Sequence, residues 1–183
     1  MKNNKLLLSI FAAVAIIQLA VPLYMAWHWE NILQTGQRFY WQTAPVDPYD
    51  AFKGRYIDLQ FKENTGQFSD IEPLVYGQTA FALIEENAAG KAYITAITGK
   101  PPEEHPYIKV KINYIEGSTA HIQLPFKRYY LPENIAAAAE SAYRQNASQS
   151  GLAAVRIKDG YGVIEELYIG DKTLTEYLRD YIQ

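Results

Sequence analysis

Residues 107–125 read YIKVKINYIEGSTAHIQLP, and this stretch decides the fold because its pattern is that of a β-hairpin. Apolar residues alternate with lysines over residues 108–112, the period of two that is typical of a half-buried strand. Glu116-Gly117-Ser118 then supplies a turn. The stretch therefore predicts two antiparallel strands, at residues 107–115 and 119–125.

Similar patterns lie on both sides of this hairpin. Asn87-Ala88-Ala89-Gly90 and Gly160-Tyr161-Gly162 are turn sequences, each between two apolar-rich runs. In contrast, residues 62–73 are polar and indicate a loop. The predicted strands are 37–43, 54–61, 78–86, 91–98, 107–115, 119–125, 153–159 and 163–169.

Two segments have helical periodicity instead. Residues 132–147 begin with a proline at the expected first position and carry apolar residues on one face, and residues 173–183 show a similar register. Strands joined by short turns favour antiparallel pairing. We therefore predict an α+β fold that is mostly antiparallel β, barrel- or sandwich-like, with one or two packed helices.

A long apolar segment precedes this domain. Residues 6–27, LLLSIFAAVAIIQLAVPLYMAW, contain no charge and as a helix extend about 33 Å, enough to cross a hydrocarbon core. The lysines that flank this apolar segment lie on its N-terminal side, within residues 1–5. The positive-inside rule therefore predicts a single-pass anchor in the inner (cytoplasmic) membrane, with residues 1–5 in the cytoplasm. Residues 28–36 are then a neck, and residues 37–183 form an extracytoplasmic, periplasmic domain.

A cleaved signal peptide is the alternative to an anchor. Cleavage requires small residues at the processing site, but Tyr24 lies two positions before Ala26 and Gln18 two positions before Ala20. An uncleaved anchor is the better interpretation. We expect Gln18 and Ser9, its two polar residues, to be available for hydrogen bonds to another membrane helix.

The composition of the chain argues against several classes of function. The chain has 17 basic and 20 acidic residues, and this acidic balance argues against nucleic acid and against anionic lipid held by a basic patch. Cysteine is absent, which removes disulfides, thiolate metal sites and thiol nucleophiles. Stability must come from packing, in which fifteen tyrosines and seven phenylalanines take part.

The segment Gly54-Arg55-Tyr56-Ile57-Asp58-Leu59-Gln60-Phe61 resembles the motif of the GDYXXLXY family of uncharacterised bacterial membrane-anchored proteins. The preceding run TAPVDPYD (43–50) and the later run RYYLPE (128–133) resemble further landmarks of that family, in the same order. The resemblance covers essentially all of the predicted extracytoplasmic part. Its members are often encoded beside polytopic membrane proteins, so the resemblance implies a polytopic membrane protein as partner, besides the lipid bilayer.

This chain departs from the family motif at two positions. Arg55 stands at the aspartate position and Phe61 at the last tyrosine. Arginine only donates hydrogen bonds and stays protonated, so it cannot replace a metal ligand or general base. If the family has one function, neither position carries its chemistry, and a structural role at the start of a strand fits better.

Catalytic candidates are weak. Asp47, Asp50, Arg55 and Asp58 would suit cation binding or acid–base chemistry, but aspartates beside prolines are ordinary turn residues. A membrane-tethered serine–lysine hydrolase needs an activated serine, and no serine has a recognisable nucleophile context. The serines considered are Ser69, Ser118, Ser141, Ser148 and Ser150. His28, His105 and His121 lack metal-ligand spacing, so we predict no metal, no cofactor and no catalytic residue.

Aromatic residues on strands are the remaining signal for binding. Tyr56, Tyr107, Tyr129 and Tyr130 suit a platform for peptide or glycan, although buried rings would give the same pattern. The segment 128–133 either lines a groove or simply ends a strand before a helix. The candidate binding residues are Arg55, Tyr56, Arg128, Tyr129, Tyr130 and Glu133.

Three classes of function stay open on these grounds. The preferred hypothesis is a non-enzymatic accessory protein that works with a polytopic membrane protein. An envelope glycan- or peptide-binding module is the alternative, and a membrane-tethered hydrolase comes third.

Overall fold

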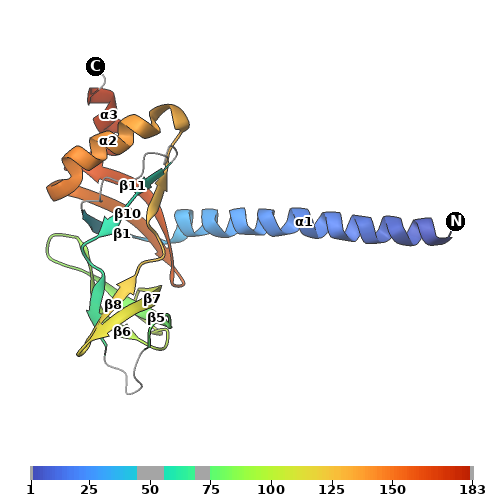
Figure 1. Cartoon of the computed structure of the whole chain (residues 1–183), viewed down its shortest axis with the longest axis horizontal. Coiled ribbons are helices and arrows are strands. Elements are labelled where there is room, and N and C mark those ends of the chain that lie inside the picture. The colour runs from blue at the N-terminus through green and yellow to red at the C-terminus, as the bar shows by residue number, and fades with distance from the viewer. Residues whose placement is uncertain (1, 45–55, 69–74, 182–183) are drawn as a thin grey trace.

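The computed structural model describes residues 2–44, 56–68 and 75–181. Its most prominent feature is α1 (Lys2–Thr35), a long helix that projects from the rest of the molecule (Figure 1). Among the described residues it is the one helix long and apolar enough to cross a membrane, and none of its most apolar window is buried. The helix runs without a break through the predicted neck, so the neck is a direct continuation of the apolar segment.

The first sheet packs against the end of α1. It contains β1 (Gln37–Ala44), which follows α1 after one residue and pairs antiparallel with β10 (Gly151–Lys158). Phe39 and Trp41 face inward from β1 and are almost completely buried. The full order is β12-β11-β10-β1-β3, with β3 at Gln60–Phe61, β11 at Tyr161–Ile169 and β12 at Lys172–Thr173.

The second sheet is a nearly closed antiparallel barrel. Its order is β4-β8-β7-β5-β6, and Phe68, just after β4, bridges to Ile97 of β6 and so brings the two edges together. Every second side chain along its strands points inward, and these small and branched side chains fill the interior. Its strands are β4 (Thr65–Gln67), β5 (Thr79–Glu86), β6 (Ala92–Thr98), β7 (Tyr107–Glu116) and β8 (Thr119–Gln123).

A third, two-stranded sheet and two helices complete the structure. β2 (Tyr56–Asp58) pairs with β9 (Arg128–Tyr130), and α2 (Glu133–Ser150) and α3 (Leu174–Tyr181) cover the first sheet (Figure 1). Pro132 is the N-cap of α2 and not its first helical residue, and the helix continues three residues beyond the predicted end. The predicted α+β, mostly antiparallel fold with a barrel-like sheet is confirmed.

Two local predictions were wrong. The single strand predicted at 54–61 is divided at Leu59, because β2 pairs with β9 whereas β3 pairs with β1. The segment predicted as loop contains β4, which pairs with β8. The N–H of Leu59 donates to the carbonyl oxygen of Lys127 (2.7 Å), which fills the gap between the two short strands.

One hydrophobic cluster connects both sheets. Trp41 of β1 packs edge-to-face against Phe61 and Phe126, with ring centroids 6.2 and 5.6 Å away. Phe126 lies between β8 and β9, so this aromatic group joins the barrel to the first sheet. Gly162 makes room for it, since a Cβ there would lie 2.6 Å from the ring of Phe126.

Candidate functional site

The pairing of β2 with β9 brings four of the predicted binding residues together. Tyr56 lies opposite Tyr130, and Asp58 lies opposite Arg128, with Tyr129 between them on β9. The two strands are separated by about seventy residues of sequence, so only the tertiary fold creates this cluster. Sequence spacing alone gives no sign of it.

The outward side of this strand pair carries a stacked arrangement of rings and charge. The Arg128 guanidinium lies over the Tyr56 ring, 4.6 Å from its centroid, and the Tyr56 and Tyr130 centroids are 5.7 Å apart. Arg128 Nε also lies 3.8 Å from Asp58 Oδ1. Tyr130 is 67% exposed, so one face of the group is open to a ligand.

Tyr129 has a different environment from its two neighbours. It is half-buried, and its hydroxyl donates a 3.0 Å hydrogen bond to Glu166 Oε1 on β11. Burial, followed by the negative charge of Glu166, raises the pKa of Tyr129 well above its usual value. Its hydroxyl therefore keeps its proton and fixes β9 to β11, which is a positioning role.

A groove of about 490 Å³ opens beside this cluster, between β9, the start of β11 and the last turns of α1. Trp29 of α1 is part of its wall, and this residue is two positions beyond the end of the apolar segment. Within the segment 128–133, Arg128, Tyr129 and Tyr130 line the groove, and Pro132 and Glu133 lead into α2. The groove is lined by Trp29, Pro125, Phe126, Lys127, Arg128, Tyr129, Tyr130, Gly162, Val163 and Ile164.

The other predicted residues do not add to the described cluster. Arg55, like Asp47 and Asp50, lies outside the described residues, and Glu133 is exposed at the first position of α2 without lining the groove. Tyr107 does not join the platform, because it packs against Phe81 (centroids 5.6 Å apart). In α1, the Ser9 hydroxyl donates to the carbonyl oxygen of Lys5 in the same helix, whereas Gln18 is exposed.

The candidate nucleophiles and metal ligands are dispersed. Ser118 donates to Gln67, and Ser150 donates to a backbone oxygen of its own helix. The histidines lie on α1, in a loop and on β8, where His121 stacks on Tyr114. Within the described ranges, no three His, Asp or Glu side chains gather as metal ligands do. Of the other serines, Ser69 lies outside the described residues, and Ser141 and Ser148 are on α2.

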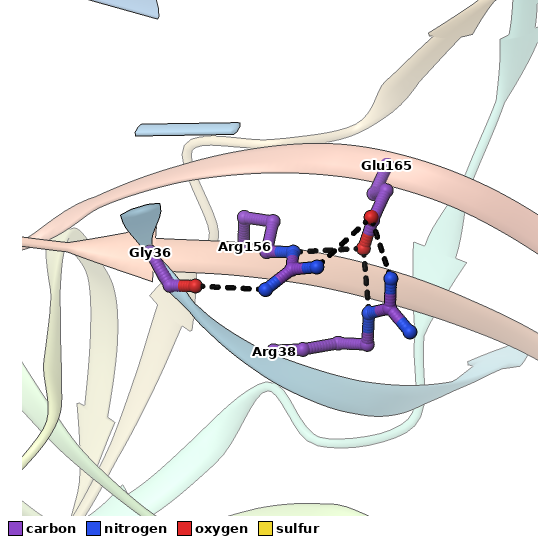
Figure 2. Close-up of polar contacts among 4 residues, drawn as sticks. All are labelled: Gly36, Arg38, Arg156 and Glu165. Atoms are coloured by element: carbon purple, nitrogen blue, oxygen red, sulfur yellow. Dashed lines mark hydrogen bonds and ion pairs between the residues drawn. The ribbon is translucent and has the colours of Figure 1, made fainter. Parts of the chain in front are cut away.

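A charged cluster that the sequence did not reveal holds α1 to the first sheet (Figure 2). Glu165 of β11 accepts two hydrogen bonds from Arg38 (2.6 and 2.7 Å) and two from Arg156 (2.9 and 3.1 Å). Arg156 also donates to the carbonyl oxygen of Gly36 (3.1 Å), the residue directly after α1. The hydrogen bond from Arg38, with that from Arg156, holds the pKa of Glu165 below its usual value.

The groove and the charged cluster both lie where α1 meets the rest of the molecule, a region that we call its base. The groove offers a guanidinium and an ammonium group beside exposed aromatic faces, a combination that suits polypeptide segments with carboxylate or carbonyl groups. The cluster fixes the groove relative to α1 and thus to the membrane that α1 is able to cross. The place of Trp29 in the groove was not predictable from the sequence.

Comparison with known proteins gives one result. No curated protein matches the chain, and no solved structure matches it. The model of the GDYXXLXY family matches residues 18–167, which extend from the middle of α1 into β11 and include the barrel, the groove and the first sheet except β12 and the end of β11. The chain therefore belongs to the GDYXXLXY protein family.

Proposed function

We propose that this protein is a membrane-anchored, extracytoplasmic accessory protein that binds a polytopic membrane protein through α1 and the groove at its base. The observation that supports the proposal is Trp29 in the wall of the groove, because this residue belongs to α1 and the groove therefore adjoins that helix. A partner with its own membrane helices would contact both surfaces at the same time. Gln18 in α1 supplies a polar contact for such a helix.

The aromatic–cation group supports a protein ligand. Tyr130 and Trp29 are 67% and 42% exposed, and such rings with arginine are typical of the centres of protein interfaces. The stacking of Arg128 on Tyr56 holds the guanidinium in place before binding, which lowers the entropy cost of association.

Site-specific photo-crosslinking tests the groove. A photoreactive amino acid at position 130 should capture one membrane protein with several spans, whereas the same amino acid at Tyr76, which is 83% exposed, should not. Co-purification of that protein in mild detergent should fall with Arg128→Ala and with Gln18→Leu. Ser9→Ala is the matched control in the helix, since the Ser9 hydroxyl bonds within α1.

Two results would count against the proposal. Equal capture at positions 130 and 76 would mean that the groove has no specific partner. Retention of residues 28–183 on isolated cell walls, with loss of retention in Tyr130→Ala, would favour the glycan- or peptide-binding module instead.

A further inference from the structure

A second groove of about 340 Å³ adjoins the first and is markedly basic. The two grooves share Pro125 and Lys127, so they form a continuous surface. Four basic residues line this surface, and none of the described residues that line it is acidic. The second groove is lined by Thr79, Lys109, Val110, Lys111, Gln123, Leu124, Pro125 and Lys127.

Ring contacts fix the height of this surface along α1. The Lys109 ammonium lies 5.3 Å from the centroid of the Tyr161 ring, and Tyr161 packs edge-to-face against His28 and Trp29 of α1. The Lys109 N–H donates to the carbonyl oxygen of Gly160 (2.9 Å), which holds β7 at this level.

The position of Lys109 and Tyr161 along α1 corresponds to the headgroup layer of a bilayer. The apolar segment ends at Trp27, and two further helical residues advance about 3 Å along the axis. The headgroup region adds roughly 5–8 Å to each side of the hydrocarbon core. Lys109 therefore lies where the phosphate groups of lipids lie when α1 spans the bilayer.

The ammonium groups are available for a ligand. Lys109 and Lys127 are exposed and make no ion pair within the described ranges. Lys111 donates to the hydroxyl of Thr79 (2.8 Å), which holds it at the edge of the groove. Asp159, at the turn before Gly160, is the acidic residue nearest in sequence to Tyr161, and it is exposed.

We propose that Lys109 and Lys127 bind the phosphate of an anionic phospholipid in the leaflet that the C-terminal half of α1 enters. This differs from the inference drawn above from the net negative charge, because four basic residues and no acidic residue line the two grooves, and local charge decides binding within a Debye length. Such binding would set the rotation of the domain about α1. It goes beyond the proposed partner: Lys127 lines both grooves, whereas Lys109 lines only the second.

Native mass spectrometry of the full chain, transferred from micelles that contain a defined lipid, tests this site. The chain should retain phosphatidylglycerol in preference to phosphatidylcholine. Removal of one interfacial lysine should weaken retention about fivefold, so Lys109→Gln with Lys127→Gln should weaken it by roughly thirtyfold. Lys127→Gln alone provides a second variant that leaves the Lys109–Tyr161 contact intact, with an expected loss of about fivefold.

Lys62→Gln with Lys172→Gln is the matched control. It makes the same change of charge at two lysines that line neither groove, since Lys62 follows β3 and Lys172 is on β12. The control should retain phosphatidylglycerol as the unchanged protein does. Thermal unfolding of each variant verifies the fold.

Four outcomes would overturn the proposal. These are unchanged retention in the Lys109 and Lys127 variants, an equal loss in the control pair, equal retention of the two lipids, and displacement of the lipid by inorganic phosphate at millimolar concentration. The last would assign the surface to free phosphate and not to a membrane.

Discussion

Glu165 lies at the centre of the charged cluster where α1 meets the first sheet. Its carboxylate joins β11 to β1 through Arg38 and to β10 through Arg156, and Arg156 continues to Gly36 at the end of α1. The Glu165 side chain is 23% exposed, so these charge-assisted hydrogen bonds are partly shielded from solvent.

Glu165→Gln should lower the free energy of unfolding at pH 7 by about 1–2 kcal/mol, because two arginines lose their charged partner. The folded state favours the ionised carboxylate and lowers its pKa, so this stabilisation is present above the ordinary value of 4.5 and is lost as the pH falls below it. Thermal unfolding from pH 7 to pH 3 should therefore show a smaller fall for the variant than for the unchanged protein.

Glu86→Gln is the control for this comparison, because Glu86 is exposed at the end of β5. It should have little effect at either pH. A Glu165→Gln protein with the full pH dependence would show that other carboxylates are responsible.

Tyr143 and Thr43 form the buried polar contact between α2 and β1. Their hydroxyl oxygens are 2.9 Å apart, and burial raises the pKa of Tyr143 to about 12, so the phenol is neutral at physiological pH. Tyr143→Phe should cost about 1 kcal/mol, since Thr43 is 1% exposed and would lose its partner. Urea unfolding of the full chain in micelles measures this loss.

A double-mutant cycle isolates the contact. Thr43→Val combined with Tyr143→Phe should cost less than the sum of the two single changes. Strict additivity would mean that the two hydroxyls do not interact.

The residues of the candidate site could be predicted from the sequence, but their assembly into one site could not. Tyr56, Arg128, Tyr129 and Tyr130 stand out because they lie in the two family landmarks GRYIDLQF (54–61) and RYYLPE (128–133). Their assembly depends on the pairing of β2 with β9, which no local pattern encodes. The contribution of Trp29 depends on the packing of α1 against β10 and β11, which is likewise a tertiary effect.

Among the elements, α3 depends on Thr173, the residue directly before the helix. Thr173 and Glu176 form a capping box, in which the N–H of Glu176 donates to the Thr173 hydroxyl (3.2 Å) and the N–H of Thr173 donates to the Glu176 carboxylate (3.0 Å). The helix has only eight residues, so its own propensity is insufficient without this cap and the burial of Leu174 and Leu178.

Thr173→Ala should therefore reduce the free energy of unfolding by about 1 kcal/mol. Thr175→Ala is the matched control, because Thr175 is exposed inside the same helix. Thr173→Ser should restore most of the loss, since serine provides the same hydroxyl. Equal effects of the two alanine changes in urea unfolding would contradict the capping role.

Local periodicity was sufficient to predict the three hairpins, because their turns and alternation are contiguous in sequence. It failed at β4, where Thr65-Gly66-Gln67 contains no apolar side chain. Gly66 packs its backbone against the barrel interior, and a Cβ there would lie 2.8 Å from Ile94 and 2.9 Å from Ile97. A strand that contributes backbone and no side chain to the core leaves no apolar signature.

For the whole molecule, the orientation in the membrane is the main prediction. The chain has no cysteine, so one introduced thiol reports on one position. Ala89→Cys, in the turn between β5 and β6, should react with a membrane-impermeant maleimide in intact spheroplasts. Asn4→Cys should react only after lysis, because the positive-inside rule retains the lysine-bearing end in the cytoplasm. The reverse pattern would place the domain in the cytoplasm.

The connection between α1 and the first sheet has a mechanical consequence. The N–H of Gly36 donates to the carbonyl oxygen of Ile32 (2.8 Å), Lys158 donates to the hydroxyl of Thr35 (2.8 Å), and Arg156 holds the oxygen of Gly36. These three hydrogen bonds leave no hinge at the junction, so α1 and the domain move together as one rigid body. Transmembrane helices tilt by about 20° on average, and the angle changes with bilayer thickness. A thinner bilayer would tilt α1 further and would therefore tilt the whole domain by the same angle. The position of the domain above the membrane surface would thus depend on the thickness of the membrane.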